Sequence, residues 1–480
     1  MFEDLTPGKH LLFDNTSIAD TYQLTRIVHQ PMRNPASPVF LQEDREGLYV
    51  TPLNVIYDTV LNKYRMWYQE HDIHVENERK ALNNSPHGNV GAPQPIYLCY
   101  AESTDGLKWD RPALDIFKHK DGRATNIVFK GHSYSAGNTF VYQPDAPPDR
   151  RYLLVNCDWQ STQSGGIYIA ASPDGLRWSY INDKPLIHGE SDTWNCLVWN
   201  AQRKVYMLYM RAWHSAAWGW TQDALPGKHN VGPWKGNPRR RVSYSESSDL
   251  LSWSEPQIIY SPDELDTNDF YGMQVFRYED YFLGMLWLYD DDQWETIDVE
   301  LAWSHDGIRW QRHPQRPKFL PCRKASERPE YMVIPAQQPT AVNDDLFLYH
   351  VSHRPPHSQE KTNSVVYRTH LRRDGFVSLE AGRLPGTLIT RPFVLQNDHL
   401  TINARADQGE IVAELVEPWW YDPSGKAIEG FAAKDFDIIR EDKVSHRLSW
   451  RGKSNLSMLK GRRIMLRLAL YHAGIYSVTV

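Results

Sequence analysis

The sequence has few cysteines, which disulfide scaffolds and many zinc sites require. Its 480 residues include four cysteines, none paired at a metal-ligand spacing. Cys99, Cys157 and Cys196 lie in apolar runs, so we expect buried free thiols. There is no glycine-rich phosphate loop, and the one His-x-x-x-His pattern, His353 to His357, encloses two prolines that would break a helix. The sequence therefore contains no motif for a metal site or a nucleotide-binding site.

The chain also lacks an excess of charge of either sign. Fifty-three lysines and arginines stand against 59 aspartates and glutamates, which gives a net charge of -6 with the histidines neutral. A nucleic-acid-binding protein would show a basic surface. The longest basic run is Arg239–Arg241, and three charges are more typical of a solvated loop than of a binding patch. We therefore expect no nucleic-acid partner.

Long apolar runs are missing as well. No uninterrupted apolar run approaches the length of a membrane span, so we expect no membrane partner. The first residues, Met1–Pro7, show neither the charged nor the apolar part of a signal peptide. This predicts a cytoplasmic protein, or a secreted one if a signal peptide has been removed. Apolar residues rarely recur with a helical period and 31 prolines are scattered along the chain, which argues against a helical fold.

What the sequence does contain is one short phrase, Ser-x-Asp-Gly-x-x-Trp, repeated along the chain. Complete or nearly complete copies lie at 103–109, 172–178, 247–253 and 304–310, and a degenerate fifth copy lies at 373–378. In the third copy Leu250 replaces the glycine. Self-similarity at this spacing indicates repeated supersecondary units.

Each repeat has the same internal order of short, aromatic-rich runs separated by turn residues, which is typical of antiparallel strands. The glycine after the aspartate supplies the positive φ of a tight turn, and the tryptophan can fold back over that turn. We therefore interpret the shared aspartates as turn residues and not as catalytic ones. They are Asp105, Asp174, Asp249 and Asp306, with Asp374 in the fifth copy.

The repeats predict an all-β protein. Five units, at about 49–109, 138–178, 192–253, 269–310 and 330–378, favour a five-bladed β-propeller over residues 1–385. After that the runs alternate and are separated by turns such as Asp-Pro-Ser-Gly, which predicts a β-sandwich over 386–480. Two long loops, 71–95 and 213–238, interrupt the repeats. The second carries four tryptophans, and such loops are usually functional.

Aromatic residues are abundant. The 18 tryptophans and 26 tyrosines exceed what a core of this size requires. Flat rings with a polar edge suit the faces of sugars, so the clustered rings suggest a carbohydrate site. The alternative is that most of them are structural, because each repeat already uses one tryptophan at its own turn.

Together, the repeated turn phrase, the five units and the trailing β-domain resemble the glycoside hydrolase superfamily that contains families 32, 68 and 43. Family 32 is nearest in layout, and the likeness in architecture extends over the whole chain. The turn phrase also occurs in sialidase-like propellers, as the Asp box. The Trp-Met-Asn-Asp-Pro-Asn-Gly, Arg-Asp-Pro and Glu-Cys motifs of family 32 are missing, and the counterpart of the first, Glu46–Asn54, contains no Asp-Pro. The resemblance therefore implies a sugar-processing fold without a fructosidase active site.

Glycoside cleavage needs two carboxyl groups on opposite sides of the scissile bond. Asp192 and Asp269 each precede an aromatic residue by seven positions, which makes them equivalent at the starts of innermost strands, and Glu330 opens the fifth unit. We predict Asp192 as nucleophile or base and Asp269 or Glu330 as the general acid. The alternatives are turn roles for Asp192 and Asp269 and a surface salt bridge for Glu330.

The same mouth of the propeller is predicted to bind the substrate. The predicted contacts are Glu46, Asn54, Trp67, Asn138, Trp194, Asn195, Arg211, His214, Tyr271, Trp287, His353 and Arg354. No cofactor is predicted, while a structural cation on the propeller axis and homo-oligomers are left open. The predicted activity is hydrolysis of a furanose-type, fructan-type or otherwise modified oligo- or polysaccharide. A non-catalytic carbohydrate-binding propeller and a protein-interaction propeller are the alternatives.

Overall fold

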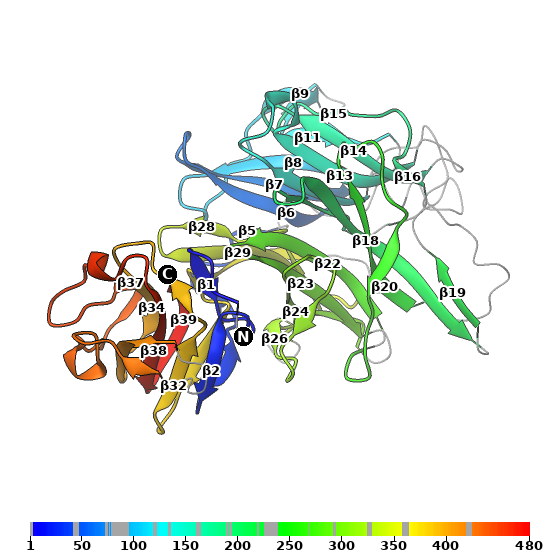
Figure 1. Cartoon of the computed structure of the whole chain (residues 1–480). Coiled ribbons are helices and arrows are strands. Elements are labelled where there is room, and N and C mark those ends of the chain that lie inside the picture. The colour runs from blue at the N-terminus through cyan, green and yellow to red at the C-terminus, as the bar shows by residue number, and fades with distance from the viewer. Residues whose placement is uncertain are drawn as a thin grey trace. The chain divides into compact units, whose positions relative to one another are not determined.

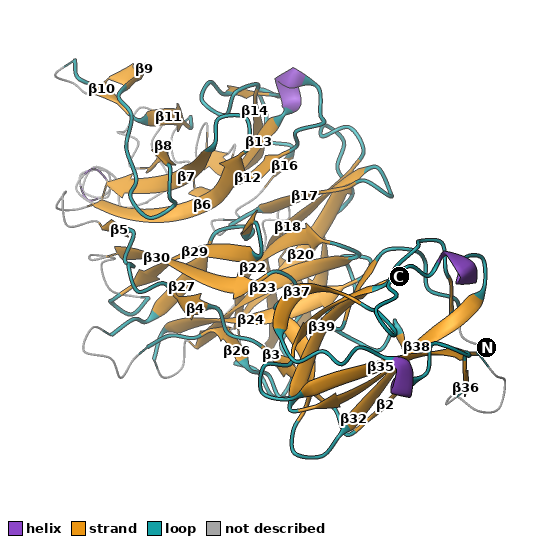
Figure 2. Ribbon diagram, turned by 90° about the vertical axis from the view of Figure 1, so that its left-hand side faces the viewer, coloured by secondary structure: helices purple, strands orange, loops and turns teal. Residues whose placement is uncertain are grey.

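The computed structural model describes residues 3–41, 48–72, 75, 77, 96–118, 122–132, 136–159, 165–188, 191, 194–217, 220–224, 239–267, 269–290, 294–323, 329–357, 364–418 and 425–480. At 40–41, 48–49, 136–138, 159, 213–217 and 220–224 it describes the backbone alone. Within these ranges the protein is all-β, and strands joined by turns and short 3₁₀ helices dominate the view in Figure 2. The 3₁₀ helices are η1 (Pro148–Arg150), η2 (Ala433–Asp435) and η3 (Ser457–Leu459).

The chain divides into two compact units. Unit 1 comprises Met1–Gln30, Asn343–Leu346 and Leu371–Val480, and unit 2 comprises Pro31–Val342 and Phe347–His370. Unit 2 contains the four complete turn phrases and all the predicted site residues. It is therefore the unit in which the functional site must be sought.

Antiparallel sheets follow one another along unit 2 (Figure 1). The first has β6 (Leu48–Asp58), β7 (Lys63–Asp72), β8 (Ile96–Ser103) and β11 (Ile127–Lys130), and beside it β9 (Leu114–Lys118) pairs with β10 (Ala124–Thr125). The second has β12 (Ala136–Tyr142), β13 (Tyr152–Trp159), β14 (Gly165–Ser172), β15 (Ser179–Tyr180) and β16 (Ile187–His188). The third has β17 (Cys196–Asn200), β18 (Val205–Ala217), β19 (Trp220–Ala224), β20 (Arg239–Ser247) and β21 (Gln257–Tyr260).

Two further groups of strands share one sheet, because Ile297 and Met332 form a parallel bridge between them. The fourth group has β22 (Asp269–Tyr278), β23 (Tyr281–Asp290), β24 (Thr296–Ser304), β25 (Gln311–Arg312) and β26 (Lys318–Leu320). The fifth has β27 (Met332–Pro335), β28 (Thr340–Val342), β29 (Asp345–His353) and β30 (Ser364–Arg372), with β4 (Met32–Arg33) and β5 (Phe40–Leu41) paired to β30. A segment from the beginning of the chain thus completes the fifth group.

Four contacts join the first strands of these groups. β6 contacts β12, β12 contacts β17, β17 contacts β22, and β27 contacts β6. The first strand of the fifth group therefore lies beside that of the first group, although about 280 residues separate them in the sequence. β17 and β22 run in the same sense, because Trp194, just before β17, lies beside Trp287, the partner of Gly272, while Cys196 lies beside Val275 further along. The starts of these two strands therefore lie at the same end.

The repeated phrase forms the same turn at each of its four complete copies. In the second copy the Ser172 hydroxyl accepts a hydrogen bond from the amide of Gly175 (2.9 Å), and Asp174 Oδ1 accepts from the amides of Leu176 and Arg177 (2.8 and 2.9 Å). The other three copies repeat these bonds. The residue after the aspartate has a φ of 70° to 76° in all four, Leu250 included. The predicted turn role of these aspartates is confirmed.

Side chains of one group close over the turn of the next. The bonds run from Trp67 Nε1 to the carbonyl of Gly175 (2.6 Å), from Tyr209 Oη to that of Gly307 (2.8 Å) and from Tyr349 Oη to that of Gly106 (2.9 Å). The last bond joins the fifth group to the first. The turns are therefore contact points between neighbouring groups as well as local reversals of the chain.

We expect Gly175→Ala to lower the free energy of unfolding by roughly 2–3 kcal/mol. A Cβ there would lie 2.6 Å from Cζ2 of the buried Trp67 ring, which would have to shift. Gly122→Ala is the matched control: its φ is also positive (83°), but no atom lies within 4 Å of an added Cβ. It should cost only the backbone strain, about 1–2 kcal/mol. Urea unfolding of both variants measures the difference, and equal losses would contradict a contact role for this turn.

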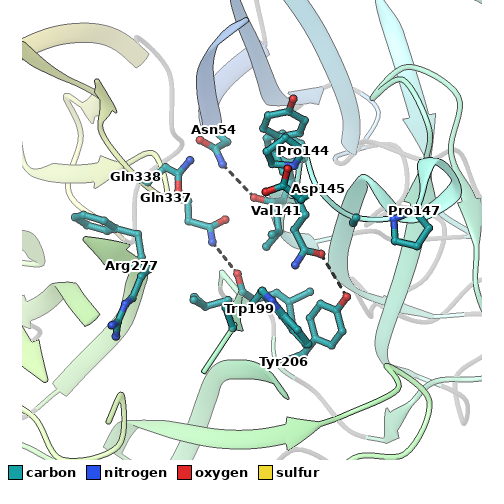
Figure 3. Close-up of a pocket in the computed structure, with 18 residues that line it drawn as sticks. Asn54, Val141, Pro144, Asp145, Pro147, Trp199, Tyr206, Arg277, Gln337 and Gln338 are labelled. Carbon is teal, nitrogen blue, oxygen red and sulfur yellow. Dashed lines mark hydrogen bonds between the residues drawn. The ribbon is translucent and has the colours of Figure 1, made fainter. Parts of the chain in front are cut away.

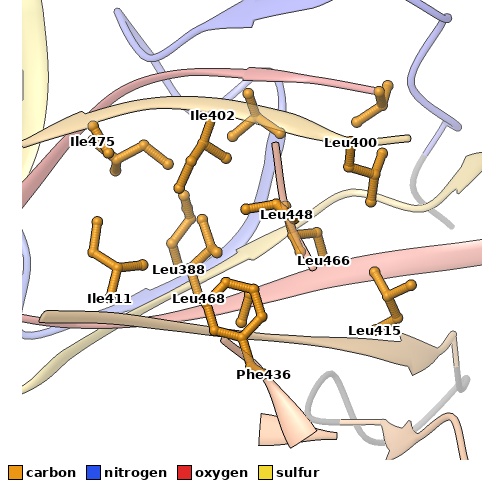
Figure 4. Packing of buried hydrophobic residues seen from close by; sticks show 14 of the residues in the cluster. Leu388, Leu400, Ile402, Ile411, Leu415, Phe436, Leu448, Leu466, Leu468 and Ile475 are labelled. Atoms are coloured by element: carbon orange, nitrogen blue, oxygen red, sulfur yellow. The ribbon is translucent and has the colours of Figure 1, made fainter. Parts of the chain in front are cut away.

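Unit 1 consists of two sheets around one core. One sheet has β1 (Lys9–Leu11), β3 (Thr25–Val28), β31 (Val377–Ala381), β34 (Thr401–Arg405), β37 (Asp442–Arg447) and β39 (Ala473–Thr479). The other has β2 (Ile18–Tyr22), β32 (Gly386–Thr390), β33 (Phe393–Val394), β35 (Glu410–Glu417), β36 (Lys426–Ala427) and β38 (Arg463–Tyr471). Buried side chains from both sheets, such as Ile402, Ile475, Ile411 and Leu468, form its core (Figure 4). On β38 they alternate with more exposed residues, as expected for a strand with one buried face.

The predicted boundary at residue 385 assigned the first 30 residues to the propeller, whereas the structure groups them with unit 1. These group with the C-terminal strands because β1 pairs with β39, β2 with β32 and β3 with β31. Leu12 and Ile18 add their side chains to the core of unit 1. Pairing between strands so far apart in the sequence leaves no local signal, since each strand carries only its own period-two pattern.

Candidate functional site

The described residues predicted for the site lie mostly at the starts of the first strands of unit 2. Trp194 and Asn195 directly precede β17, Asp269 begins β22, and Glu330 stands two residues before β27. Asp192 and Glu46 lie outside the described residues, and of Asn138 and His214 only the backbone is described, in β12 and β18. The site can therefore be built from the third, fourth and fifth groups of strands.

An aromatic cluster occupies this end of β22 and β23. The Trp287 ring is fully buried, and its centroid lies 6.1 Å from that of Trp194 and 6.2 Å from that of Tyr271, with which it is stacked. Tyr271 also contacts Tyr289 edge-on at 5.6 Å, and its hydroxyl is hydrogen-bonded to His357 Nε2 at 2.9 Å. Trp194 and Tyr271 remain partly exposed, so their rings are the parts of the cluster that a ligand can reach.

Arginines surround the Tyr271 ring. The Arg211 guanidinium carbon lies 4.4 Å from the ring centroid, and Arg211 Nη2 donates to the Tyr271 carbonyl at 3.2 Å. Arg240 lies 5.4 Å from the same centroid and 5.0 Å from that of Tyr289. Guanidinium groups over aromatic faces are held in place by the ring quadrupole. Arg211 is buried and supports the ring, whereas Arg240 is partly exposed, so the cluster combines ring faces with one accessible guanidinium group, which suits a ligand rich in oxygen atoms.

Asp269 is paired with Arg240 and lies close to Arg241. Its Oδ1 accepts a hydrogen bond from the amide of Arg240 (2.6 Å), its Oδ2 accepts from Arg240 Nη1 (2.8 Å), and Arg241 Nη1 lies 3.9 Å from Oδ1. The residue is 0 % exposed. A carboxylate buried in this way cannot touch a substrate in this conformation. These contacts therefore support a role for Asp269 in orienting Arg240 and Arg241 and do not support its predicted catalytic role.

The basic run Arg239–Arg241 was expected to form a solvated loop, and that expectation is wrong. The run begins β20, where Arg241 pairs in register with Ala212 and Arg239 with His214 of β18. Similarly, the loop predicted from residue 213 starts later, because β18 continues to Ala217 and pairs with β19. Burial against Asp269 keeps the run ordered, and nothing in the local sequence distinguishes such a run from a solvated one.

Glu330 is likewise paired, with an arginine from the beginning of the chain. Arg33 Nη1 and Nη2 donate to its two carboxylate oxygens at 2.9 and 2.8 Å, and the Arg33 guanidinium lies 3.6 Å from the Tyr367 ring centroid. Burial alone would raise the pKa of Glu330, but the hydrogen bonds and charge of Arg33, with Tyr367, outweigh it and lower the pKa. A general acid needs a raised pKa, so this arrangement does not support the predicted proton-donating role. The alternative, a salt bridge, is present, although it is buried.

Asn195 has a structural role and belongs to a buried hydrogen-bond network. Its side chain accepts a hydrogen bond from the Ser191 hydroxyl (2.6 Å) and donates to the Ser191 carbonyl (3.0 Å), while its own carbonyl accepts from the Thr139 hydroxyl. The Ser191 hydroxyl in turn accepts from the amide of Arg211 at 3.2 Å. This fully buried network connects β12, β17 and β18 and fixes the backbone from which Arg211 projects.

Other predicted contacts lie elsewhere. Trp67 is fully buried among the side chains between the first and second groups, where its indole donates to Gly175, so it has a packing role. Asn54 lies further along β6 and donates to the carbonyl of Phe140. His353 is buried and bonded to Ser364 at 2.8 Å. Arg354 is partly exposed just after β29.

Four residues of the site were not predicted. They are Arg33, Arg240, Tyr289 and His357. Arg240 belongs to the basic run that was predicted to be a solvated loop. His357 belongs to the His-x-x-x-His pattern that was rejected as a metal motif. Arg33 and Tyr289 carry no signal, because an arginine near a proline and a tyrosine in a buried strand occur in any such protein.

Within the described residues no three His, Cys, Asp or Glu side chains gather as a metal site would require. The three cysteines predicted to be buried thiols are buried, and Cys322 is partly exposed. In the same part of the chain, no helix combines the length and the apolar character that a membrane span demands.

Comparison with known proteins gave results for structure alone. No family model and no curated protein matches the chain. A solved structure described as a glycoside hydrolase is similar with a TM-score of 0.45 and 11% identity, over 74% of this chain and 92% of that one. The β-1,2-mannobiose phosphorylase from Listeria innocua, in complex with β-1,2-mannobiose, gives 0.45 and 10% over 71% and 96%. A thermostable family-43 glycoside hydrolase gives 0.43 and 12% over 69% and 94%.

Proposed function

We propose that the chain is a glycoside hydrolase whose site lies at the strand-start end of unit 2. The observation that carries the proposal is the cluster at that end, in which the partly exposed rings of Trp194 and Tyr271 stand beside the partly exposed Arg240 and His357. Aromatic faces stack on the C–H faces of sugar rings, and guanidinium groups bind hydroxyl or acidic substituents. The substrate class is a furanose-type, fructan-type or otherwise modified saccharide.

The proposal includes the architecture. Unit 2 is a five-bladed β-propeller, with β6, β12, β17, β22 and β27 as its innermost strands, and unit 1 is a β-sandwich. Two features support the propeller. The first strands of groups one to four contact one another in order and that of the fifth contacts that of the first, and Tyr349 of the fifth group binds the turn at Gly106 of the first. Closed radial repetition protects the edges of its sheets.

The carboxyl groups then have distinct roles. Asp269 positions Arg240 and Arg241, and Glu330, held ionised by Arg33, has its charge balanced by that arginine. Asp192 is still the carboxyl group proposed to act as nucleophile or base, because its position in the sequence is equivalent to that of Asp269. The general acid is not assigned to any described residue.

A non-catalytic carbohydrate-binding propeller is the second candidate. The observation in its favour is that both described carboxylates predicted to be catalytic are paired with arginines. Such a protein would keep the rings and arginines and would need no proton donor. The two candidates differ in turnover and agree in binding.

A hydrolysis screen of aryl glycosides and oligosaccharides, with furanosides, fructans and uronate-containing sugars among them, tests the proposal. Turnover by the wild type should fall by ~10³-fold or more in Asp192→Asn and should weaken sharply in Tyr271→Ala, while the exposed Asp280→Asn control retains it. Turnover that survives both substitutions would place the chemistry elsewhere. Sugar binding by calorimetry that Tyr271→Ala abolishes, with no turnover on any substrate, would establish the binding module instead.

A further inference from the structure

Four partly exposed side chains of the aromatic cluster are open to a ligand. They are Trp194, Tyr271, Arg240 and His357. Glycoside hydrolysis needs a group that gives a proton to the leaving oxygen. An arginine does not lose its proton in proteins, and an indole nitrogen acts as a hydrogen-bond donor only. Of these four side chains, the Tyr271 hydroxyl and the His357 imidazole are therefore the two that can exchange a proton.

The described carboxylates predicted for catalysis leave the proton donor unassigned. Asp269 is 0 % exposed and accepts a hydrogen bond from Arg240 Nη1 (2.8 Å). Glu330 accepts two hydrogen bonds from Arg33 (2.9 and 2.8 Å), which favour its ionised form. A general acid must carry its proton at the working pH, so near neutral pH an imidazole suits this role better than either carboxylate.

Tyr271 and His357 are bonded to each other. Tyr271 Oη and His357 Nε2 lie 2.9 Å apart, and the two rings meet edge to face with their centroids 5.2 Å apart. The histidine is held from two further sides, because its main-chain amide donates to the Glu295 carbonyl (3.1 Å) and its ring lies 4.9 Å from that of Tyr289. A proton can therefore pass between the ring nitrogen and the phenol oxygen without a rearrangement of either side chain.

Two guanidinium groups lie beside the Tyr271 ring. The guanidinium carbons of Arg211 and Arg240 are 4.4 and 5.4 Å from its centroid. Arg211 is fixed by its bond to the Tyr271 carbonyl (3.2 Å), and Arg240 by its bond to Asp269. Fixed cations stabilise negative charge that builds up during a reaction. The phenol oxygen can therefore give up its proton to a substrate before its replacement from His357 is complete.

From these observations we infer that Tyr271 and His357 together are the general acid of the proposed hydrolase, an inference that rests on the proposed function. The His357 imidazolium passes its Nε2 proton to Tyr271 Oη, and the Tyr271 hydroxyl proton passes to the glycosidic oxygen. The bond between the anomeric carbon and that oxygen breaks, and its electron pair stays with the oxygen, which leaves as an alcohol. A hydroxyl group from water ends on the anomeric carbon. The remaining proton of that water goes to solvent, from which the neutral imidazole is protonated again.

The dependence of the rate on the leaving group tests this inference. An oligosaccharide has an alcohol as its leaving group and needs the proton, whereas the 2,4-dinitrophenyl glycoside of the same sugar releases a stable anion and does not. Tyr271→Phe and His357→Gln should each lower kcat/KM for the oligosaccharide by about 10²-fold or more, and for the dinitrophenyl glycoside by less than about tenfold. A purely structural role would lower both values alike.

The pH profile gives a second measurement. In the wild type, kcat/KM for the oligosaccharide should fall as the pH rises, because the imidazolium of His357 loses the proton that it must supply. The dinitrophenyl glycoside should not show this fall. His357→Gln should remove the difference between the two profiles.

Two matched controls remove the same groups elsewhere in unit 2. Tyr206→Phe removes a hydroxyl that donates to Gln143 Oε1 (3.3 Å) in a pocket beside Trp199, with which Tyr206 pairs near the far end of β17 (Figure 3). His305→Gln removes an exposed imidazole from the turn after β24. Neither control should change kcat/KM for either substrate.

The outcomes separate this inference from the proposed function. If Tyr271→Phe and His357→Gln, folded by circular dichroism, lower both kcat/KM values equally or leave both unchanged, the inference is overturned and the hydrolase is retained. If the wild type hydrolyses neither kind of substrate for any sugar in the screen, the proposed function is overturned and the inference with it.

Discussion

Arg312→Met is expected to lower the free energy of unfolding by roughly 3–5 kcal/mol. The Arg312 side chain is 3 % exposed and binds two buried carboxylates, Asp266 at 2.5 and 2.6 Å and Glu300 at 3.0 Å. Methionine fills a similar volume, so the loss comes mainly from the charges left behind. Removing one partner of a buried ion pair is much more costly than replacing the whole pair, because the remaining ions stay out of water.

Arg309→Met is the matched control, three residues away. Its side chain is 92 % exposed and lies 3.9 Å from Asp306, so its loss should cost less than about 0.5 kcal/mol. Guanidinium chloride unfolding of the two variants gives both values. If Arg312→Met cost no more than Arg309→Met, the network in the fourth group of strands would not contribute to stability.

The same variant has a predicted pH dependence. Burial by itself raises the pKa of Asp266, but the hydrogen bonds and charge of Arg312 outweigh it and lower the pKa. The stability that this carboxylate contributes is therefore present above its unfolded pKa of about 3.9 and is lost as the pH falls through the lower folded pKa. Wild type and Arg312→Met should differ most near neutral pH, and the difference should shrink below about pH 4.

Asp269→Ala is expected to cost about 3 kcal/mol of unfolding free energy and to abolish sugar hydrolysis and binding at the strand-start end. The carboxylate accepts from both the main chain and the side chain of Arg240 and faces Arg241. Without it, Arg240 loses the anion that orients its guanidinium group beside Tyr271 and Tyr289, and Arg241 loses a nearby opposite charge. Stability is read from urea unfolding, and the site from turnover and calorimetric binding.

Asp269→Asn refines this test. The asparagine oxygen can still accept from the Arg240 amide, so this variant should lose less stability than the alanine variant while it still loses the charge. The positioning role would be contradicted if a stable Asp269→Asn protein bound the substrate as tightly as the wild type does. Asp280→Ala, whose carboxylate is exposed and 4.0 Å from Arg277, serves as the control and should change neither property.

Much of the site could not be predicted because its interactions are made over long distances in the sequence. Arg33 and Glu330 are 297 positions apart, and Trp67 and the carbonyl it binds are 108 apart. The equivalence of Asp192 and Asp269 pointed to the start of β22, and Trp194, Arg211, Tyr271 and Trp287 do gather there. The sequence could not show which of these side chains would be buried or which carboxylates would pair with an arginine. Both depend on which strands become neighbours in the fold.

By itself, the sequence determined the features whose partners lie within a few residues. The Ser-x-Asp-Gly turns are predicted correctly because the serine and aspartate oxygens bind amides two or three positions away, and the strands follow from short alternating runs. Only the tertiary structure decided that β4 and β5 complete the fifth group, that the first 30 residues belong to unit 1, and that Asp269 and Glu330 face arginines. Local hydrogen bonds are fixed by covalent connection, whereas strand partners and buried ion pairs are selected only when the sheets pack.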